Sequence, residues 1–510
     1  MNKLRFDPGW WPRIAWCMLA VLAFGLRFHA LTAQGLWSDE LFSVATITQV
    51  GDGLPWYAYE AKNLPDLRLG DSFLTWKAAE NSPPLFEILL WAWTRVFGVS
   101  DLALRAPSAL LGSLAPLVLF GGLRRPLGLL PAFLGGLLFA LSPSAVAYSQ
   151  EARSYALLML LATWATVRLV RYAVPTPADP ATRPGDFRVD VLVFVLLSYT
   201  HYTGLILSGA LAGIRFLFAL RYRRPLGEFW WFALVPLLLA PWMALNWHAM
   251  RAAGSGIFGW RDFHVQDITG LMLPMAADYF VPGKYSLLLA GVAALAGAAW
   301  GMAGQGWRGL LRDARLWLVL AFAATVALHF GYGIYTAFHA RVWHPRYFLV
   351  MLPLCMTGFA LLFAQAGRRR LLPALTTLAI AAASVPALHA YYTDSTKEQY
   401  REASRYIAQH TQGRPLVVAA WTSNTIYFNH YLRLFMPQAG LAYDLTSLKT
   451  DEDVAALCQR RLAPGTQVVL FQHAMHRFYF EQVRQQCAGS LRLVSDQPFR
   501  GLFVDIFEAK

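Results

Sequence analysis

The chain has 510 residues, of which 56% are hydrophobic and only 15% are charged. So little ionic surface excludes an ordinary soluble multidomain protein. The net charge of +14 does not indicate a nucleic-acid partner, because the Lys and Arg residues form short clusters between apolar runs and not one basic face. The composition therefore predicts a polytopic membrane protein that has membrane lipids, and no nucleic acid, among its partners.

Apolar runs of roughly 17 to 25 residues mark candidate transmembrane helices, and basic clusters at their ends set the orientation. Arg13 precedes the first run, Arg124 and Arg125 follow the second, and Arg368–Arg370 follow the tenth. By the positive-inside rule these ends are cytoplasmic, so the N-terminus lies inside and the last span exits outward. We predict about eleven spans, with approximate limits 14–31, 104–122, 127–146, 155–172, 189–200, 203–220, 229–246, 285–303, 316–334, 347–366 and 371–391.

Residues 32–103 are too polar to span as a whole and are predicted to form a large outer loop. Within this loop, Pro84–Phe97 is apolar and aromatic but short, which favours a helix lying along the membrane interface. We assign this loop to a transmembrane domain of residues 1–391.

The polar tail, residues 392–510, is predicted to be a small α/β domain outside the membrane. Helix-like stretches alternate there with β-rich ones, a pattern typical of such domains. Cys458 and Cys487 both lie in this tail, where an oxidising compartment would permit one disulfide, and two unpaired thiols are the alternative. The predicted helices are 398–410, 451–462 and 475–487, and the predicted strands are 416–421, 467–472 and 502–507.

Four short polar groups recur at the predicted outer ends of spans. They are Trp37–Glu40, Gln150–Arg153, His201–Tyr202 and His344–Tyr347. Ionisable groups next to hydrocarbon are costly unless they have partners, so their gathering on one side indicates a functional site. A carboxylate there could act as a general base, and an Arg could bind a phosphate with two hydrogen bonds. Arg27 lies inside the first span and is predicted to face the bundle interior, as a partner for an acid or a lipid phosphate.

Each group also has a purely structural interpretation. Helix-end carboxylates such as Asp39 and Glu40 are common in headgroup water, and Glu151 could form a local salt bridge with Arg153. His201–Tyr202 could be a polar turn. Arg346, Tyr347 and Lys284 could be interfacial anchors, because Arg and Lys extend to the headgroup level and Tyr prefers it.

Nucleotide and metal motifs are missing from the sequence. There is no Gly-rich phosphate loop and no CxxC or HExxH spacing. A divalent cation bridging a carboxylate and a phosphate stays a candidate cofactor, without identifiable ligands.

Five segments of the membrane half, taken in order, resemble a known protein family. "LRFHALTAQGLWSDELFS", "NSPPLFEILLWAWTRVFGVSDLALRAPSALLG", "YSQEARSYALL", "SYTHYTGL" and "HPRYFLVMLP" resemble the protein O-mannosyltransferase family and its bacterial relatives, which include the lipid A aminoarabinose transferase. These are GT-C glycosyltransferases. The resemblance is strongest over residues 14–220 and looser as far as 366. One departure is Asn81–Ser82, where the mannosyltransferases have His and the aminoarabinose transferase has Lys.

The resemblance implies a GT-C fold, a polyprenyl-phosphate-linked sugar as donor, and inversion at the anomeric carbon. It places the reaction at the outer face of the bacterial cytoplasmic membrane, with a lipid, glycan or protein hydroxyl as acceptor. Asp39 would be the base, with Glu40 beside it, and Arg346 would hold the donor phosphate. The candidate substrate-binding residues are Arg27, Glu151, Arg153, His201, Tyr202, Lys284, His344, Arg346 and Tyr347.

Two other functions compete with this interpretation. A secondary transporter would show paired halves of inverted topology and charges near mid-membrane, whereas no internal repeat is visible here and the polar groups gather at one face. A ligase or polymerase of polyisoprenoid-linked glycans would share the donor class and transfer an oligosaccharide.

Overall fold

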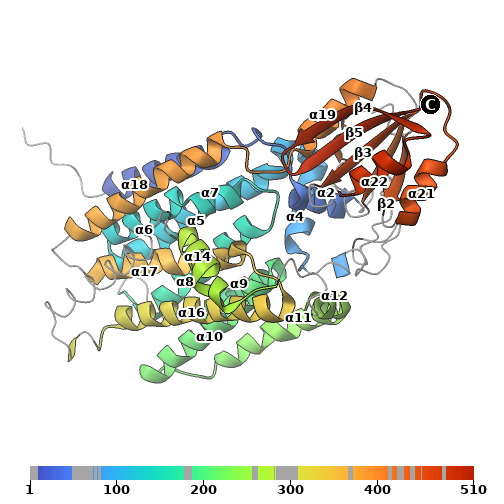
Figure 1. The fold of residues 1–510 in the computed structure, drawn as a ribbon. Coiled ribbons are helices and arrows are strands. Elements are labelled where there is room, and N and C mark those ends of the chain that lie inside the picture. The colour runs from blue at the N-terminus through green and yellow to red at the C-terminus, as the bar shows by residue number, and fades with distance from the viewer. Residues whose placement is uncertain are drawn as a thin grey trace, which may run out of the picture. The chain divides into compact units, whose positions relative to one another are not determined.

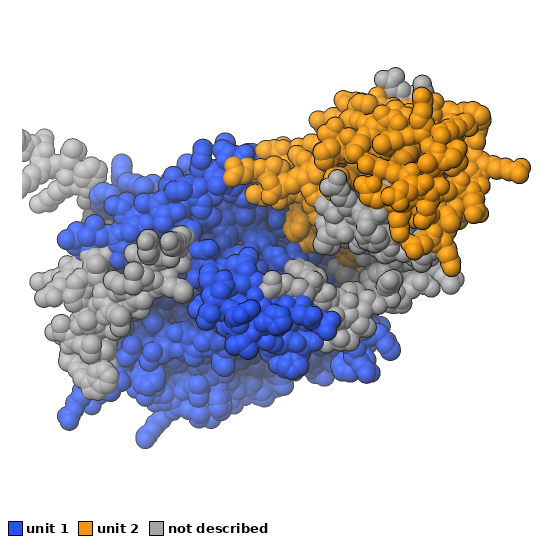
Figure 2. Space-filling view, viewed as in Figure 1, with its two compact units in different colours: residues 1–31, 81–89, 105–393 blue, residues 32–80, 90–104, 394–510 orange. Residues whose placement is uncertain are grey.

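The computed structural model describes residues 10–48, 73, 77–78, 82–176, 186–254, 262–280, 282, 308–309, 311–365, 371–411, 416–421, 430–432, 434–436, 443–448, 451–473 and 478–510. The chain divides into two compact units (Figure 2). Unit 1 comprises residues 1–31, 81–89 and 105–393, and unit 2 comprises residues 32–80, 90–104 and 394–510.

Unit 1 is helical, and its long helices lie roughly side by side (Figure 1). Among the described residues, seven helices are long and apolar enough to cross a membrane, or eight if α6 and α7, which meet at 58°, form one broken span. The helices are α1 (Trp10–Phe28), α5 (Asp101–Leu127, its first residues in unit 2), α6 (Leu129–Leu141), α7 (Pro143–Ser149), α8 (Tyr155–Ala173), α9 (Asp186–Thr200), α10 (Tyr202–Arg221), η1 (Phe229–Ala233), α11 (Leu234–Leu245), α12 (Trp247–Gly254), α13 (Val265–Asp267), η2 (Ile268–Met272), α14 (Leu273–Phe280), α16 (Ala314–Ala340), η3 (Pro345–Met351), α17 (Leu352–Gln365) and α18 (Leu371–Thr393).

These helices confirm the predicted polytopic membrane fold. Each predicted span coincides with a helix or a pair of helices, except 285–303, which lies outside the described residues. The run predicted as a single span over 127–146 is instead broken after Leu141. Pro143 explains the break, because proline has no backbone N–H to continue the helical ladder.

Small residues and a buried ion cluster bring neighbouring helices of unit 1 together. A Cβ atom on Gly135 of α6 would lie 3.0 Å from the Cβ of Ala360 in α17, so glycine permits this close approach. Asp190 of α9 accepts hydrogen bonds from Arg168 of α8 and Arg215 of α10. Three helices are therefore joined through one buried carboxylate.

Unit 2 contains a five-stranded mixed sheet in the order β2-β1-β3-β5-β4. β1 pairs in parallel with β2 and β3, whereas β5 runs antiparallel to β3 and β4. The predicted α/β class of the tail is confirmed, and β2 and β4 were not predicted. The elements of unit 2 are α2 (Ser38–Thr48), α4 (Leu85–Phe97, its first turns in unit 1), β1 (Leu416–Trp421), β2 (Tyr443–Leu448), β3 (Gln467–His473), β4 (Leu491–Phe499), β5 (Leu502–Ala509), α19 (Tyr400–Thr411), α21 (Asp451–Gln459) and α22 (Phe478–Gln486).

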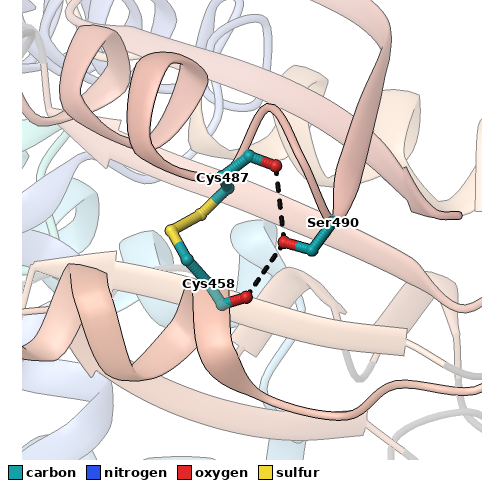
Figure 3. The surroundings of a disulfide bond; sticks show 3 residues. All are labelled: Cys458, Cys487 and Ser490. Atoms are coloured by element: carbon teal, nitrogen blue, oxygen red, sulfur yellow. Dashed lines mark hydrogen bonds between the residues drawn. A yellow bond between two sulfur atoms is a disulfide. The ribbon is translucent and has the colours of Figure 1, made fainter.

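A disulfide joins Cys458 at the end of α21 to Cys487 just after α22 (Figure 3). The hydroxyl of Ser490 donates to the carbonyl oxygens of both cysteines, at 2.9 Å for Cys458 and 3.4 Å for Cys487. Of the two alternatives left open by the sequence, the structure has the disulfide. It ties together two helices that contribute to the buried apolar core of the domain.

The predicted outer loop 32–103 clusters mainly with the C-terminal residues and not with the membrane helices. The predicted domain boundary at residue 391 stays a prediction. One contact between this loop and the C-terminal residues is the hydrogen bond from the backbone N–H of Leu36 to the Tyr431 hydroxyl, at 2.6 Å. The predicted interfacial helix forms as α4, with Ile88, Leu89 and Val96 exposed.

Candidate active site

Unit 1 brings three of the four predicted polar groups together around Tyr155, the first residue of α8. The Arg346 guanidinium carbon lies 5.9 Å from the Tyr155 ring centroid. The His201 ring lies 5.9 Å from Tyr155 and 6.0 Å from Tyr347, between centroids. His344 lies 6.4 Å from Tyr347. Residues from α8, the start of α10 and the start of η3 therefore form one aromatic and cationic cluster.

Both histidines in this cluster are helix caps, which explains their position. His201 precedes α10 in an extended conformation, and its Nδ1 accepts the backbone N–H of Thr203 at 3.2 Å. His344 precedes η3, and its Nδ1 accepts the backbone N–H of Arg346 at 3.1 Å. Because Nδ1 is an acceptor in each case, the neutral ring carries its proton on Nε2. Each imidazole is thus oriented by the helix it begins.

The acidic group after α7 forms a tight turn. The backbone N–H of Arg153 donates to the carbonyl of Glu151 at 2.8 Å, and the Ser108 hydroxyl donates to the carbonyl of Arg153 at 3.3 Å. Glu151 is only 8% exposed. The turn places a buried carboxylate and an Arg directly before Tyr155.

Two phenols that sequence reasoning missed lie beside this turn. The hydroxyls of Tyr148 in α7 and Tyr279 in α14 are 2.6 Å apart, and the Ser144 hydroxyl donates to the carbonyl of Tyr279 at 3.1 Å. Burial raises the pKa of Tyr279 to about 12; the hydrogen bond from Tyr148 lowers it, the Glu151 charge raises it, and the Arg346 charge lowers it. Tyr279 is therefore a neutral phenol within the field of both charged groups. Tyr148 lies two residues before the acidic group Gln150–Arg153, and this proximity was the signal in the sequence that could have identified it.

Arg27 occupies a closed environment at the break between α6 and α7. It is fully buried, and its guanidinium donates to the carbonyls of Ala140 at 3.1 Å and Phe139 at 3.4 Å, and to the hydroxyl of Ser149 at 3.3 Å. The regular helical donor to the Phe139 carbonyl would be the N–H of residue 143, which is a proline. This carbonyl instead accepts the Ser142 N–H at 3.4 Å, and Arg27 adds a charged donor at the break. A substrate contact for Arg27 stays a prediction, and this geometry favours a structural role.

Gln150 makes the reciprocal contact to the end of α1. Its side-chain amide donates to the carbonyls of Arg27 at 3.0 Å, His29 at 2.7 Å and Leu26 at 3.3 Å. These are carbonyls that the last turn of a helix leaves without intrahelical partners. The ends of α1 and α7 are thus fastened to each other by two side chains.

In unit 2 the two adjacent acids at the start of α2 have different surroundings. Glu40 is fully buried, accepts a 3.2 Å bond from Lys397 Nζ, and accepts the backbone N–H of Trp37 at 3.4 Å. Asp39 is half-buried, in the first turn of the helix. Glu40 therefore has a buried structural partner, whereas Asp39 retains contact with solvent.

The remaining candidates have different surroundings. The Tyr202 hydroxyl is hydrogen-bonded to the Asn246 side chain, which directs it toward the end of α11. Lys284 lies outside the described residues. Among the residues that the structure describes, no three His, Cys, Asp or Glu side chains gather where they could hold a metal ion.

Comparisons with known proteins agree with this architecture. A family model described as dolichyl-phosphate-mannose-protein mannosyltransferase matches residues 81–248. The apo structure of ArnT from Cupriavidus metallidurans gives a TM-score of 0.56 at 13% identity over 98% of both chains. The same protein bound to undecaprenyl phosphate gives 0.53 at 13% identity, again over 98% of both chains. The apo oligosaccharyltransferase of Archaeoglobus fulgidus gives 0.52 at 12% identity, over 96% of this chain and 70% of that one. No curated protein sequence matches the chain.

The class of protein follows from these findings. The chain has the fold of the GT-C glycosyltransferases, and the predicted resemblance to the protein mannosyltransferases and the aminoarabinose transferase is confirmed. The matching segment contains the turn at Glu151 and the cap at His201, two of the three groups that meet around Tyr155.

Proposed function

We propose that this protein is an inverting glycosyltransferase that moves a sugar from a polyprenyl-phosphate donor to a hydroxyl acceptor. The observation that carries the proposal is the cluster in unit 1, where Arg346 lies 5.9 Å from the Tyr155 ring and where the charges of Arg346 and Glu151 both act on Tyr279. A guanidinium matches a phosphate oxygen pair in shape and charge. A protein of the same fold has been crystallised with undecaprenyl phosphate, which supports this donor class.

The proposed reaction has one displacement step. The Asp39 carboxylate takes the proton of the acceptor hydroxyl as that oxygen bonds to the anomeric carbon, while the bond from this carbon to the phosphate oxygen breaks. The electron pair of the broken bond leaves with the polyprenyl phosphate. Arg346, assisted by Arg153 and His344, stabilises the negative charge that grows on the phosphate. The neutral phenols of Tyr148 and Tyr279 can exchange hydrogen bonds with sugar hydroxyls.

The proposed cellular setting is the outer face of the bacterial cytoplasmic membrane. By the positive-inside rule the basic clusters favour a cytoplasmic N-terminus. The disulfide between Cys458 and Cys487 supports an oxidising compartment for the C-terminal domain. A cysteine substituted for the exposed Asp451, with Cys17 and Cys355 changed to Ala, should react in intact cells or after outer-membrane permeabilisation with a membrane-impermeant thiol reagent. Protection until the inner membrane is opened would reverse this topology.

The function is tested by Asp39→Asn in the full-length protein. Polyprenyl-phosphate sugars extracted from a strain lacking the gene serve as donors, and their mass spectra identify the sugar. The substitution removes a base and almost no volume, so transfer should fall by a factor of about 10² to 10⁴ with an unchanged melting temperature. Asp451→Asn, in the first turn of α21, is the matched control and should transfer at the wild-type rate. Wild-type transfer by Asp39→Asn would contradict the assignment of the base.

A further inference from the structure

The loop that leads into α2, the helix of Asp39, is held against the C-terminal part of unit 2 by several hydrogen bonds. Gln34 Oε1 accepts the backbone N–H groups of Thr396 and Lys397, both at 2.9 Å. Arg401 donates to the carbonyls of Thr32 at 2.9 Å and Ala33 at 2.8 Å. Residues 32–34 and 396–401 are therefore joined by side-chain hydrogen bonds to backbone groups.

Two consecutive residues after the last span hold the chain on either side of Asp39. The Glu398 carboxylate accepts the backbone N–H of Ser38 at 3.0 Å. Lys397 forms the buried ion pair with Glu40 at 3.2 Å. A carboxylate at the first N–H groups of α2 also has the favourable sign for the helix dipole. Both sequence neighbours of Asp39 are thus held by the C-terminal segment, Ser38 by Glu398 and Glu40 by Lys397.

Tyr431 supplies a third attachment. Its side chain is fully buried, and its hydroxyl accepts the N–H of Leu36 at 2.6 Å while donating to Asp101 at 2.9 Å. Asp101 also binds Arg401 at 3.0 Å. One phenol consequently joins the loop before α2 to the ion pair at the start of α5.

Gly35 shows how closely these segments approach. A Cβ atom at this position would lie 2.7 Å from the Cβ of Arg401. Any side chain would push the loop away from the helix that begins at Tyr400. Glycine is therefore required by contact with the C-terminal segment.

We propose that the C-terminal domain positions the Asp39 carboxylate, with Glu398, Lys397 and Tyr431 as positioning residues. This inference rests on the proposed function, in which Asp39 is the base. Displacing a reacting group by about 1 Å can lower the rate about 10²-fold, so an attachment of this kind sets the turnover number. The domain thereby contributes to catalysis without touching the substrate.

The first experiment compares Tyr431→Phe with Tyr406→Phe in the full-length protein. Each substitution removes one phenolic hydroxyl from unit 2, but Tyr406 binds Ser495 of β4 and not residues 32–40. Hydrogen exchange of the amides in residues 32–48 should accelerate in Tyr431→Phe and stay at the wild-type rate in Tyr406→Phe. This measurement needs no substrate, so it remains informative if the proposed function fails.

The second experiment measures sugar transfer with Glu398→Gln and Glu398→Ala. Glutamine keeps an oxygen that can accept the Ser38 N–H, whereas alanine does not. We expect kcat to fall about tenfold or more in Glu398→Ala and to recover largely in Glu398→Gln, with the KM for the polyprenyl-phosphate sugar unchanged. A domain needed only for folding would instead lower the yield of folded protein and leave the kcat of that protein at the wild-type value.

The outcomes separate the two proposals. If the wild-type protein transfers no sugar from any extracted donor, the proposed function is wrong and the exchange data alone decide whether the loop is held. If the wild-type protein is active while Tyr431→Phe and Glu398→Ala keep both wild-type exchange and wild-type kcat, the positioning role is overturned.

Discussion

Arg27 in unit 1 and Glu40 in unit 2 are both fully buried charges, and the two units neutralise them differently. Arg27 is surrounded by backbone carbonyls and the Ser149 hydroxyl, whereas Glu40 has a charged partner, Lys397. In a span, irregular backbone must find hydrogen-bond donors inside the protein. Arg27 therefore donates hydrogen bonds to carbonyls at the break, and these carbonyls stabilise its buried charge. In unit 2 the buried charge of Glu40 is instead neutralised by the opposite charge of Lys397.

The largest expected effect follows from removing the charge in unit 1. Arg27→Met keeps much of the volume but removes the guanidinium that donates to the carbonyls of Phe139 and Ala140 in an apolar bundle. The free energy of unfolding should fall by about 3–5 kcal/mol, measured by thermal and denaturant unfolding in detergent. Arg27→Lys, which retains the charge but fewer donors, should lie between. An unchanged melting temperature in Arg27→Met would show that the break does not depend on this side chain.

Breaking the ion pair in unit 2 should have a smaller effect that can be partly reversed. Glu40→Gln leaves Lys397 buried without an opposite charge, and we expect a loss of about 2–4 kcal/mol. The double variant Glu40→Gln with Lys397→Met should recover part of this loss, because no unpaired charge remains. A double-mutant cycle gives the coupling energy. Additive losses in the cycle would mean that the two side chains do not act as a pair.

Gly112 of α5 tests the Arg27 site without changing any charge. A Cβ atom there would lie 2.0 Å from the Ser149 hydroxyl oxygen and 3.4 Å from Arg27 Nε. Gly112→Ala should therefore destabilise the protein by about 1–3 kcal/mol. Gly209→Ala in α10 is the matched control, because nothing lies within 4 Å of its added atom, and it should be neutral or slightly stabilising. Equal melting temperatures for the two variants would contradict the close packing at Gly112.

The smallest effect concerns the pH dependence of unit 2. Burial lowers the pKa of His430 to about 4, against the opposing charge of Asp101. The unfolded chain takes up a proton near the ordinary histidine pKa of about 6.5, so the stability contribution is present above that pH and is lost as the pH falls toward 4. Between pH 7 and pH 5 the loss should be on the order of 1–2 kcal/mol. In His430→Gln this part of the pH dependence should vanish when unfolding is followed across the same range.

The broken span shows where prediction from sequence succeeds and where it stops. The run 127–146 has the length and apolarity of a span, and Pro143 makes a break in it foreseeable. Its partner Arg27 lies 113 residues from Ala140 in the sequence, so no local pattern connects them. Similarly, the edge strands β2 and β4 were missed, because polar residues alternate along them and only their pairing with β1 and β5 establishes them.

The sequence by itself determined the membrane helices, the α/β class of the tail and the polar groups at the ends of spans. These features depend on composition and charge within about 20 residues. Only the tertiary structure decided the partners and burial within those groups: Glu40 is enclosed with Lys397, 357 residues away, while its neighbour Asp39 stays half-buried. Partner choice depends on contacts between distant segments, which hydropathy and spacing do not encode.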